Sequence, residues 1–399
     1  MDLKLSDEQQ QMVDLAKDFA INVIRPAEIE LDKISDPDEA FNSNTFKSVI
    51  KQAYEIGFHK MIIPEAYGGL GLDMFTMDLV IEQLAVGGAG LASVLIVAPA
   101  PYMFAGLFSM GNKLFIDKFV RPFCADTTGE IVGAWAITEP DIGSDCGIFD
   151  DPDIKFATKG YLKGDEYVVN GTKAAWVSNG GLAKLYMTHV TLEPEKGMMG
   201  GGIFLIPSDL PGVSTGKALD KLGLRVLNQA EVYFDDVHVP KEYLLVPPSP
   251  VVENMLENIV TIGNTGVGLL AVGVMQAAYD IALAYSKERI QGKVPIFEHQ
   301  IIQMKLMEAF YTIDAARSYL HNVGWWNANS FPGDIRRAAG ARTFACNSAT
   351  KITSEMIQIL GGYGISKEYE IEKYYRDAKL LQIMDGTVEM LCTMAATRL

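Results

Sequence analysis

The sequence has few of the residues from which metal sites and disulfide frameworks are built. Its four cysteines, Cys124, Cys146, Cys346 and Cys392, show no CxxC spacing, and none of its five histidines stands at metal-ligand spacing to another. Zinc sites and disulfide scaffolds depend on such clusters. We therefore expect no metal site and no disulfide. Unpaired cysteines are typical of a reducing compartment, and the cytoplasm is the predicted location.

Basic residues are also scarce. The chain has 34 lysines and arginines against 50 aspartates and glutamates, which gives a formal charge of -16 at pH 7. A surface of this sign repels phosphate backbones and anionic lipid. We expect no nucleic-acid partner, although a local basic patch could hold a small anionic ligand.

The chain lacks a basic, apolar leader and an uninterrupted membrane-spanning run. Its first residues place Ser6 and Gln9 at the spacing of a helix capping box. Residues 85 to 110 carry no charge and are long enough to cross a bilayer, but they are interrupted by Gly87, Gly88, Gly90, Pro99 and Pro101. A membrane span is the alternative to the buried helix pair that we expect here. We predict no membrane association.

The predicted elements fall into three parts. Residues 1–130 are mostly helical, with Leu15, Phe19 and Val23 on one face of a first helix that Pro26 ends. Residues 131–246 contain short β-rich runs, and Asn170-Gly171 predicts a hairpin. Helical patterns return over residues 247–399. Alternating βα units, a strand-linked GxGxxG and a Walker loop are missing, which excludes a Rossmann domain or a P-loop.

Asp385 is the best candidate for a catalytic base. It is followed by Gly386 and Thr387 and lies within an apolar stretch. Desolvation raises a carboxyl pKa toward the range that is useful for proton abstraction. The alternative is that Asp-Gly, a common turn pair, only marks the end of one helix and the start of the next.

Two further segments contain residues suited to a flat polar ring. Residues 135–145 offer small residues, backbone amides and the hydroxyls of Thr138 and Ser144. Some forty residues later, Trp176 and Ser178 could cover the same ring from a second strand. Each segment alone is compatible with an ordinary turn or strand.

These two segments resemble the TEPxAGSD and GxKxWIxN motifs of the acyl-CoA dehydrogenase family of flavoproteins. The family pattern continues in register through Lys221-Leu222-Gly223 and Tyr375-Arg376-Asp377 to Asp385-Gly386-Thr387. The resemblance covers nearly the whole chain. It implies a mainly α fold with a central β domain: an N-terminal helical domain, a middle β-barrel-like domain and a C-terminal four-helix bundle, assembled as a homotetramer that is a dimer of dimers.

The resemblance also implies FAD as the cofactor, bound between the β domain and the C-terminal bundle. Its ADP end would be held partly by the neighbouring subunit. The residues that match the family's FAD-binding positions are Trp135, Ile137, Thr138, Ser144, Trp176, Ser178, Arg289, Gln300, Gln358, Gly361, Gly362, Thr387 and Glu389. Ser144 and Gly386 match positions that contact the substrate.

The implied reaction is the α,β-dehydrogenation of an acyl-CoA. Asp385 would remove the α-proton while the β-hydride passes to flavin N5, and an electron-transfer flavoprotein would take the electrons. In the family, a flavin ribityl hydroxyl and the backbone amide of the base residue bind the thioester oxygen.

Two departures from the family pattern bear on the substrate. The usual base is Glu, and Asp385 is shorter by about 1.5 Å, the length of one carbon-carbon bond. A misplacement of about 1 Å can cost on the order of a hundredfold in rate. The second departure is Asn264, which stands where the family has an Arg that holds the CoA arm. The stretch Val260–Thr265 also contains no carboxylate to serve as an alternative base.

These departures predict a short, branched or alicyclic acyl group of the cyclohexanecarboxyl type. We expect the glycines at 263, 266, 268 and 273 to make room around its α-carbon. An alternative function is a flavoprotein oxidase similar to nitroalkane oxidase, in which Asp is the base and no CoA is needed. A third is a catalytically weak flavin-binding or acyl-CoA-binding partner subunit.

Overall fold

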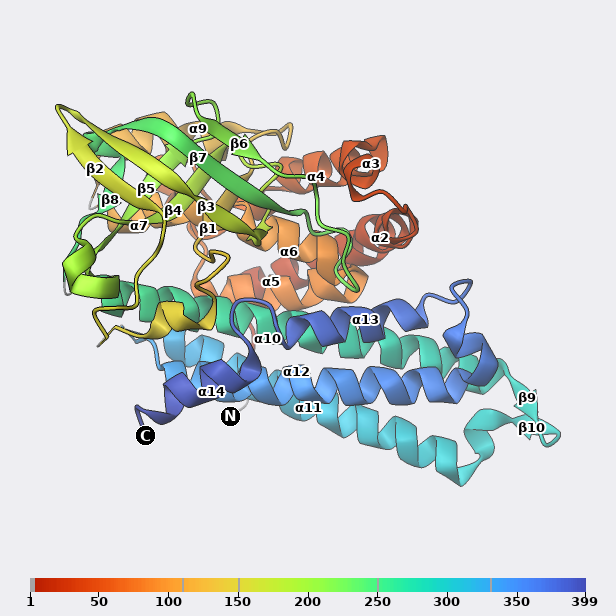
Figure 1. Ribbon diagram of the computed structural model, residues 1–399. Helices are drawn as coiled ribbons and strands as arrows, with labels where there is room; N and C mark the ends of the chain where they lie inside the picture. Colours follow the sequence, from red (N-terminus) through yellow and green to blue (C-terminus); the bar gives the residue numbers. More distant parts are fainter. Residues whose placement is uncertain (1–3, 110, 150, 250, 331) are drawn as a thin grey trace.

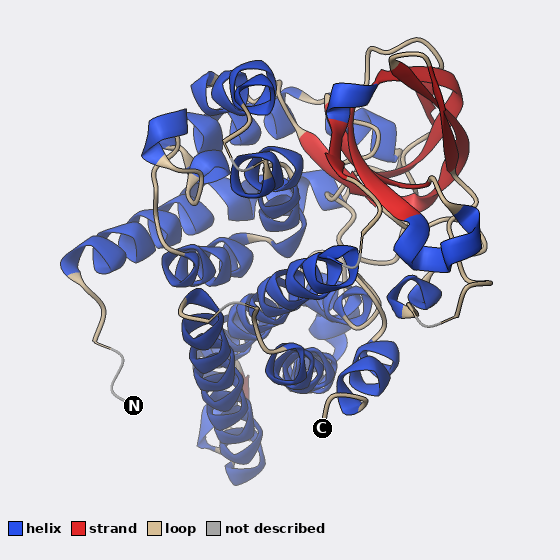
Figure 2. Ribbon diagram, turned by 90° about the vertical axis from the view of Figure 1, so that its left-hand side faces the viewer, coloured by secondary structure: helices blue, strands red, loops and turns tan. Residues whose placement is uncertain are grey.

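The computed structural model describes residues 4–109, 111–149, 151–249, 251–330 and 332–399. Helices form the first and last parts of the chain and strands form the middle, as the sequence predicted (Figures 1 and 2). The N-terminal helices end at Ala125, and the strands run from Gly133 to Val246. We propose domain limits at residue 130, in the connection before β1, and at residue 246, where the last strand of the middle part ends.

Nine α-helices make up the described N-terminal part. They are α1 (Asp7–Phe19), α2 (Arg25–Asp32), α3 (Pro37–Asn42), α4 (Asn44–Ile56), α5 (Met74–Gly87), α6 (Ala89–Val97), α7 (Ala100–Phe108), α8 (Lys113–Phe115) and α9 (Arg121–Ala125). The Ser6–Gln9 capping box is present at the start of α1. Pro26 does not end the first helix, because a π-helical turn, Ala20–Ile24, leads directly into α2 and Pro26 lies in its first turn.

The described part of the apolar segment, residues 85 to 109, lies largely inside the protein. It forms α6 and α7, and α6 packs against α5 and α10 while α7 packs against β1. Two stretches, Ala89–Leu107 and Glu253–Glu288, are long and apolar enough to cross a membrane, but in each of them 67% of an apolar 18-residue segment is buried in the fold. The prediction of a buried helix pair is confirmed.

The middle part is a curled sheet (Figure 2). Its strands are β1 (Gly133–Ala136), β2 (Lys159–Lys163), β3 (Glu166–Ser178), β4 (Leu185–Thr191), β5 (Gly201–Pro207), β6 (Val213–Thr215), β7 (Gln229–Pro240) and β8 (Leu244–Val246). They are ordered β6-β7-β3-β2-β4-β5-β8, and β1 pairs with β4 in parallel. Alternating positions of β7 are buried: Ala230, Val232 and Phe234, and then Val237 and Val239.

The hairpin predicted at Asn170-Gly171 is wrong. Strand β3 runs through both residues, and its register against β7 shifts between Val169 and Gly171. The Asn170 side chain donates to the Asp236 carboxylate and accepts from the Asp236 N–H, both at 2.9 Å. The pair therefore forms an irregularity within a long strand rather than a chain reversal.

The C-terminal part consists of α10 (Val251–Glu288), α11 (Gln300–Ala328), α12 (Ile335–Leu360), α13 (Ile371–Leu381) and α14 (Val388–Ala396). A small ribbon of β9 (Ile290–Gln291) and β10 (Val294–Pro295) joins α10 to α11. Helix α10 is the central helix, because it packs against α11, α12 and α13 on one side and against α5 on the other (Figure 1).

Four glycines of α10 were expected to make room around the α-carbon of the substrate. Two of them, Gly268 and Gly273, allow the helices to pack closely instead. A Cβ on Gly268 would lie 2.5 Å from Leu320 Cδ2, and a Cβ on Gly273 would lie 2.5 Å from Ala85 Cβ. These glycines allow α11 and α5 to approach α10 closely. The prediction that they open space for a substrate is wrong.

Candidate active site

A cavity of about 620 Å³ lies where the three parts of the chain meet. Helices α5, α6, α7 and α10, the ends of β1 and β3, and the connection between α13 and α14 all contribute to its walls. The walls are largely apolar, with Ile81 and Leu84 from α5, Met103 from α7 and Leu270 from α10. A cavity of this kind suits a ligand with an apolar part and a few polar contacts.

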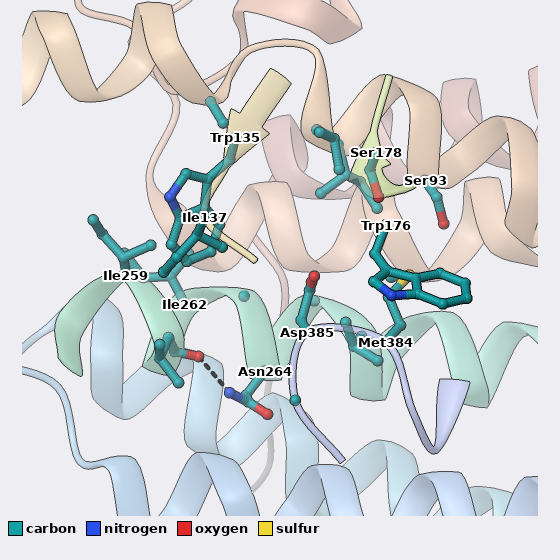
Figure 3. Close-up of a pocket in the computed structure, with 18 of the residues that line it drawn as sticks. Ser93, Trp135, Ile137, Trp176, Ser178, Ile259, Ile262, Asn264, Met384 and Asp385 are labelled. Carbon is teal, nitrogen blue, oxygen red and sulfur yellow. Dashed lines mark hydrogen bonds between the residues drawn. The ribbon is translucent and has the colours of Figure 1, made fainter. Parts of the chain in front are cut away.

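Asp385 lies in the turn between α13 and α14 and opens into this cavity (Figure 3). Its backbone is left-handed, with φ 53°, and Gly386 follows with φ 95°. Asp is among the few non-glycine residues that adopt this conformation readily. Next, the Thr387 hydroxyl accepts from the Met390 N–H at 3.3 Å and caps α14. Asp385 is thus part of a turn and also faces a cavity.

The environment of the Asp385 carboxylate favours proton abstraction. Although the residue is open to the cavity, desolvation by the surrounding walls raises the pKa of its carboxyl, and the nearby charge of Arg342 partly opposes this. Among the described residues, no side chain or backbone group donates a hydrogen bond to the carboxylate. A desolvated carboxylate without a hydrogen-bond partner is suited to act as a general base.

Residues of the β domain line the opposite side of the cavity. Trp135, Ile137 and Thr138 lie at and just after the end of β1, and Trp176 and Ser178 lie on β3. The structure brings nine of the predicted site residues to this one cavity: Trp135, Ile137, Thr138, Ser144, Trp176, Ser178, Asp385, Gly386 and Thr387. Figure 3 shows Asp385 between Trp135 on one side and Trp176 on the other.

Two buried polar side chains hold β1 and the residues after it in place, and the sequence had indicated no role for either of them. His189 Nε2 accepts a hydrogen bond from Trp135 Nε1 at 2.9 Å, and burial lowers the pKa of His189 to about 3, so the ring is neutral. Lys173 donates to the Ile137 carbonyl at 3.2 Å and to the Glu139 carboxylate at 2.7 Å. Lys173 stands inside the GxKxW-like segment, whereas nothing in the sequence pattern marks His189.

Gln229 on β7 has a similar effect on β3. Its side-chain amide donates to the Ser178 hydroxyl at 3.1 Å and to the Trp176 carbonyl at 3.3 Å. The Trp176 side chain remains 59% exposed although it lines a cavity. An indole held this open offers a broad apolar face to a flat ligand.

Both ends of the Asn264 side chain on α10 form hydrogen bonds with protein groups. Its Nδ2 donates to the Val260 carbonyl at 2.6 Å (Figure 3), and its Oδ1 accepts from Arg342 Nη1 at 2.7 Å. Asn264 therefore fixes Arg342 rather than offering a free group to a ligand. Sequence reasoning missed Arg342, a fully buried residue of α12.

The remaining predicted residues lie elsewhere. Arg289, Gly361 and Gly362 line a second cavity of about 600 Å³ at the end of the C-terminal part where β9 and β10 lie. The Arg289 guanidinium is 5.6 Å from the centre of the Tyr363 ring, which also lines this cavity. Gln300 begins α11 and Gln358 lies in the last turn of α12, near this cavity in sequence, and Glu389 is exposed on α14. None of these six residues lines the cavity that contains Asp385.

Comparison with known proteins agrees with this arrangement. Models for acyl-CoA dehydrogenase match the chain in order, with the N-terminal domain over residues 6–127, the middle domain over residues 134–237 and the C-terminal domain over residues 254–399. The chain is 34% identical over 404 residues to Bacillus subtilis YngJ, which is named as a probable acyl-CoA dehydrogenase; the alignment covers 100% of both chains.

Two further relatives point the same way. The short-chain specific acyl-CoA dehydrogenase of Bos taurus mitochondria is 31% identical over 389 residues, covering 97% of this chain and 89% of the relative. The structure of butyryl-CoA dehydrogenase from Megasphaera elsdenii superposes with a TM-score of 0.87 at 30% identity, covering 100% of this chain and 99% of that one. This chain therefore belongs to the acyl-CoA dehydrogenase family of FAD-dependent oxidoreductases.

Proposed function

We propose that this protein converts a short, branched or alicyclic acyl-CoA, such as a cyclohexanecarboxyl thioester, to its 2-enoyl-CoA. The observation that carries the proposal is the Asp385 carboxylate, which faces the cavity desolvated and without a hydrogen-bond donor among the described residues. A carboxylate in this state is a competent base toward a weakly acidic carbon next to a thioester carbonyl.

The residues around the cavity fit FAD. The open indole of Trp176 and the hydroxyls of Thr138, Ser144 and Ser178 line one space opposite Asp385. These residues, together with Trp135, would hold the flavin. When bound, FAD supplies the acceptor for the β-hydride.

The chain's own groups would handle the proton and the developing negative charge. Asp385 takes the α-proton onto its carboxylate. The Asp385 N–H makes no hydrogen bond with another described residue, so it is free to donate to the thioester oxygen. When a substrate fills the cavity, the apolar walls would keep water from the ionised base and strengthen both interactions.

Space beside Asp385 supports an acyl group wider than a straight chain. Gly263 and Gly266 both line the cavity, and a Cβ on either one would meet no atom within 4 Å. The Asp385 side chain is one methylene shorter than the Glu that is usual in the family, so its carboxylate reaches less far into the cavity. The α-carbon of the substrate must therefore come closer to the backbone of residue 385. The open faces of these two glycines leave room for substituents on that carbon.

We also propose that the enzyme works as a homotetramer, a dimer of dimers. Helix α11 carries Ile301, Met304, Met307 and Tyr311 along one face, each with more than half of its surface exposed. A stripe of this kind is typical of a surface covered by another chain. A neighbouring copy would also bring Arg289, Gly361 and Gly362 to the ADP end of the cofactor.

We propose an electron-transfer flavoprotein as the partner that accepts the electrons. The cytoplasmic location stays a prediction.

The alternative function is a nitroalkane oxidase-like enzyme. It is favoured by the short side chain of Asp385 and by the uncharged Asn264, which stands where the family has an Arg and whose side chain bonds to protein groups. Anaerobic mixing of the holoenzyme with butyryl-CoA, isobutyryl-CoA, cyclohexanecarboxyl-CoA and nitroethane separates the two. We expect the flavin to be bleached fastest by a branched or cyclic thioester. Bleaching by nitroethane alone, with peroxide on aeration, would replace our proposal with the alternative.

A straight butyryl chain that bleaches the flavin faster than any branched or cyclic thioester would overturn the substrate class but leave the reaction in place. If none of the substrates bleached the flavin, the result would favour the third alternative, a catalytically weak flavin-binding or acyl-CoA-binding partner subunit.

A further inference from the structure

The turn that carries Asp385 leaves several backbone carbonyls without backbone partners. Helix α13 ends at Leu381, and α14 begins at Val388. Within the described chain, no backbone N–H donates to the carbonyls of Leu381, Met384 or Asp385. Buried carbonyls in such a position need another donor, because leaving them unpaired is costly.

Arg342 supplies all of these donors from α12. Its Nη1 donates to the Asp385 carbonyl at 3.2 Å, and its Nη2 donates to the Leu381 carbonyl at 3.2 Å and to the Met384 carbonyl. Nη1 also donates to Asn264 Oδ1 at 2.7 Å, which ties the guanidinium to α10. One planar group thus joins α12, α10 and the end of α13 directly beneath the candidate base.

The charge of Arg342 is placed in an unusual way. The side chain is fully buried, and no carboxylate of a described residue forms a salt bridge with it. Its four hydrogen-bond acceptors are neutral oxygens. A buried cation of this kind is stabilised by the negative end of α13 and by any negative charge on Asp385.

We propose that Arg342 is the positioning residue of the active site: it holds the Asp385 turn in its left-handed conformation and keeps the carboxylate aimed into the cavity. The inference rests on the proposed role of Asp385 as the base. Arg342 itself does not reach the substrate space, because it is not part of the cavity wall.

The shape of the Arg342 guanidinium and its positive charge make separate contributions to its effect on Asp385. An arginine presents five N–H groups in a fixed fork, which matches oxygens from several elements, whereas a lysine ammonium is a compact point charge. A lysine at position 342 would keep the charge but could not span Asn264 and three carbonyls. A methionine would lose both.

The charge also has a measurable consequence for Asp385. Arg342 lowers the carboxyl pKa against the larger, opposite effect of desolvation. The other charged residues that line the cavity are Asp220, Lys221, Glu253, Glu257, Lys379 and Arg398, and none of them contributes to the shift. Removing the Arg342 charge should therefore raise the pKa of Asp385 further.

The test compares flavin reduction in single turnovers across a pH series for the wild-type holoenzyme and for Arg342→Met and Arg342→Lys. We expect Arg342→Met to slow reduction by about a hundredfold, as for a base displaced by about 1 Å, and to move the acid limb to higher pH. Arg342→Lys should also slow reduction but leave the acid limb nearly unchanged. Arg337→Met, on an exposed part of the same helix, is the matched control and should behave as wild type.

Bound FAD and the thermal midpoint of each variant show whether the fold is intact. If Arg342→Met does not fold, Arg342→Lys and Asn264→Ala carry the test, since each removes contacts of the fork and should slow reduction at least tenfold. Folded, FAD-loaded variants that reduce at the wild-type rate with an unchanged pH profile would overturn the role of Arg342. That result would leave the proposed function intact, whereas wild-type activity in Asp385→Asn would instead refute the function.

Discussion

Filling the space beside Gly263 should change which acyl groups the enzyme accepts. A Cβ on Gly263 meets no atom within 4 Å, so the side chain of Gly263→Val would project into the cavity rather than into protein. A valine side chain is stiff in a helix and would not swing aside. The substitution therefore removes volume from the substrate space without displacing a neighbour.

The magnitude follows from this geometry. Crowding a fitted apolar group costs about 1 to 3 kcal/mol, so kcat/KM for cyclohexanecarboxyl-CoA should fall roughly 5- to 150-fold. A narrow butyryl group should lose much less. Replacing a helical glycine by alanine gains about 1 kcal/mol in folding free energy, so Gly263→Ala should be at least as stable as wild type.

The assay is the ratio of kcat/KM for the cyclic and the straight thioester, measured in wild type, Gly263→Val and the control Gly273→Ala. In the control, the new Cβ would meet Ala85 at 2.5 Å, so stability should fall by about 1 to 3 kcal/mol while the substrate ratio stays constant. A folded Gly263→Val enzyme with an unchanged ratio would refute the idea that this glycine makes room for the acyl group.

Two predictions concern pH. Because desolvation raises the pKa of Asp385 and the base must be ionised, kcat/KM should fall as pH drops through a value above the ordinary 3.8 of an aspartate; an acid limb at or below 3.8 would argue against a desolvated base. Burial raises the pKa of Asp78 on α5 to about 8, so the folded state binds this proton more tightly and stability should fall as pH rises from about 4 to about 8. Asp78→Asn should remove that loss, which the thermal midpoints at pH 5 and pH 8 would reveal as a smaller decrease than in wild type. Equal decreases in both proteins would contradict a protonated Asp78.

Nine of the fifteen predicted site residues line the cavity, because strand ends and turns place consecutive residues predictably. Thr138 follows β1, and Ser178 ends β3. Asp385 lies in a turn, as the Asp-Gly pair predicted. The sequence offered two readings of Asp385, a turn or a base. The structure makes these compatible, because the turn is what directs the carboxylate into the cavity.

The residues that sequence reasoning missed act across long separations. His189 contacts Trp135 from 54 positions away, Gln229 contacts Ser178 from 51, and Arg342 contacts Asn264 from 78. No local periodicity reports such pairs, because they exist only once the helices and strands have packed. Arg342 in particular carries no motif and looks in sequence like an ordinary helical arginine.

Local propensity also failed where tertiary pairing competed with it. Asn170-Gly171 is a strong hairpin signal, but the partners on β7 continue on both sides of it and keep β3 extended. Gly268 and Gly273 looked like Gly263 and Gly266 in sequence. Only the packing of α10 against α11 and α5 separates glycines that allow helix contact from those that open a cavity.

The central claim is that Asp385 is the base of an acyl-CoA dehydrogenation, and a single-turnover measurement tests it most directly. Wild-type holoenzyme and Asp385→Asn, both loaded with FAD, are mixed anaerobically with the acyl-CoA that wild type reduces fastest. Loss of a general base costs typically 10²- to 10⁴-fold, so we predict that flavin reduction in the variant slows by about that factor while FAD content is unchanged. Reduction of the flavin at the wild-type rate in Asp385→Asn would contradict the account.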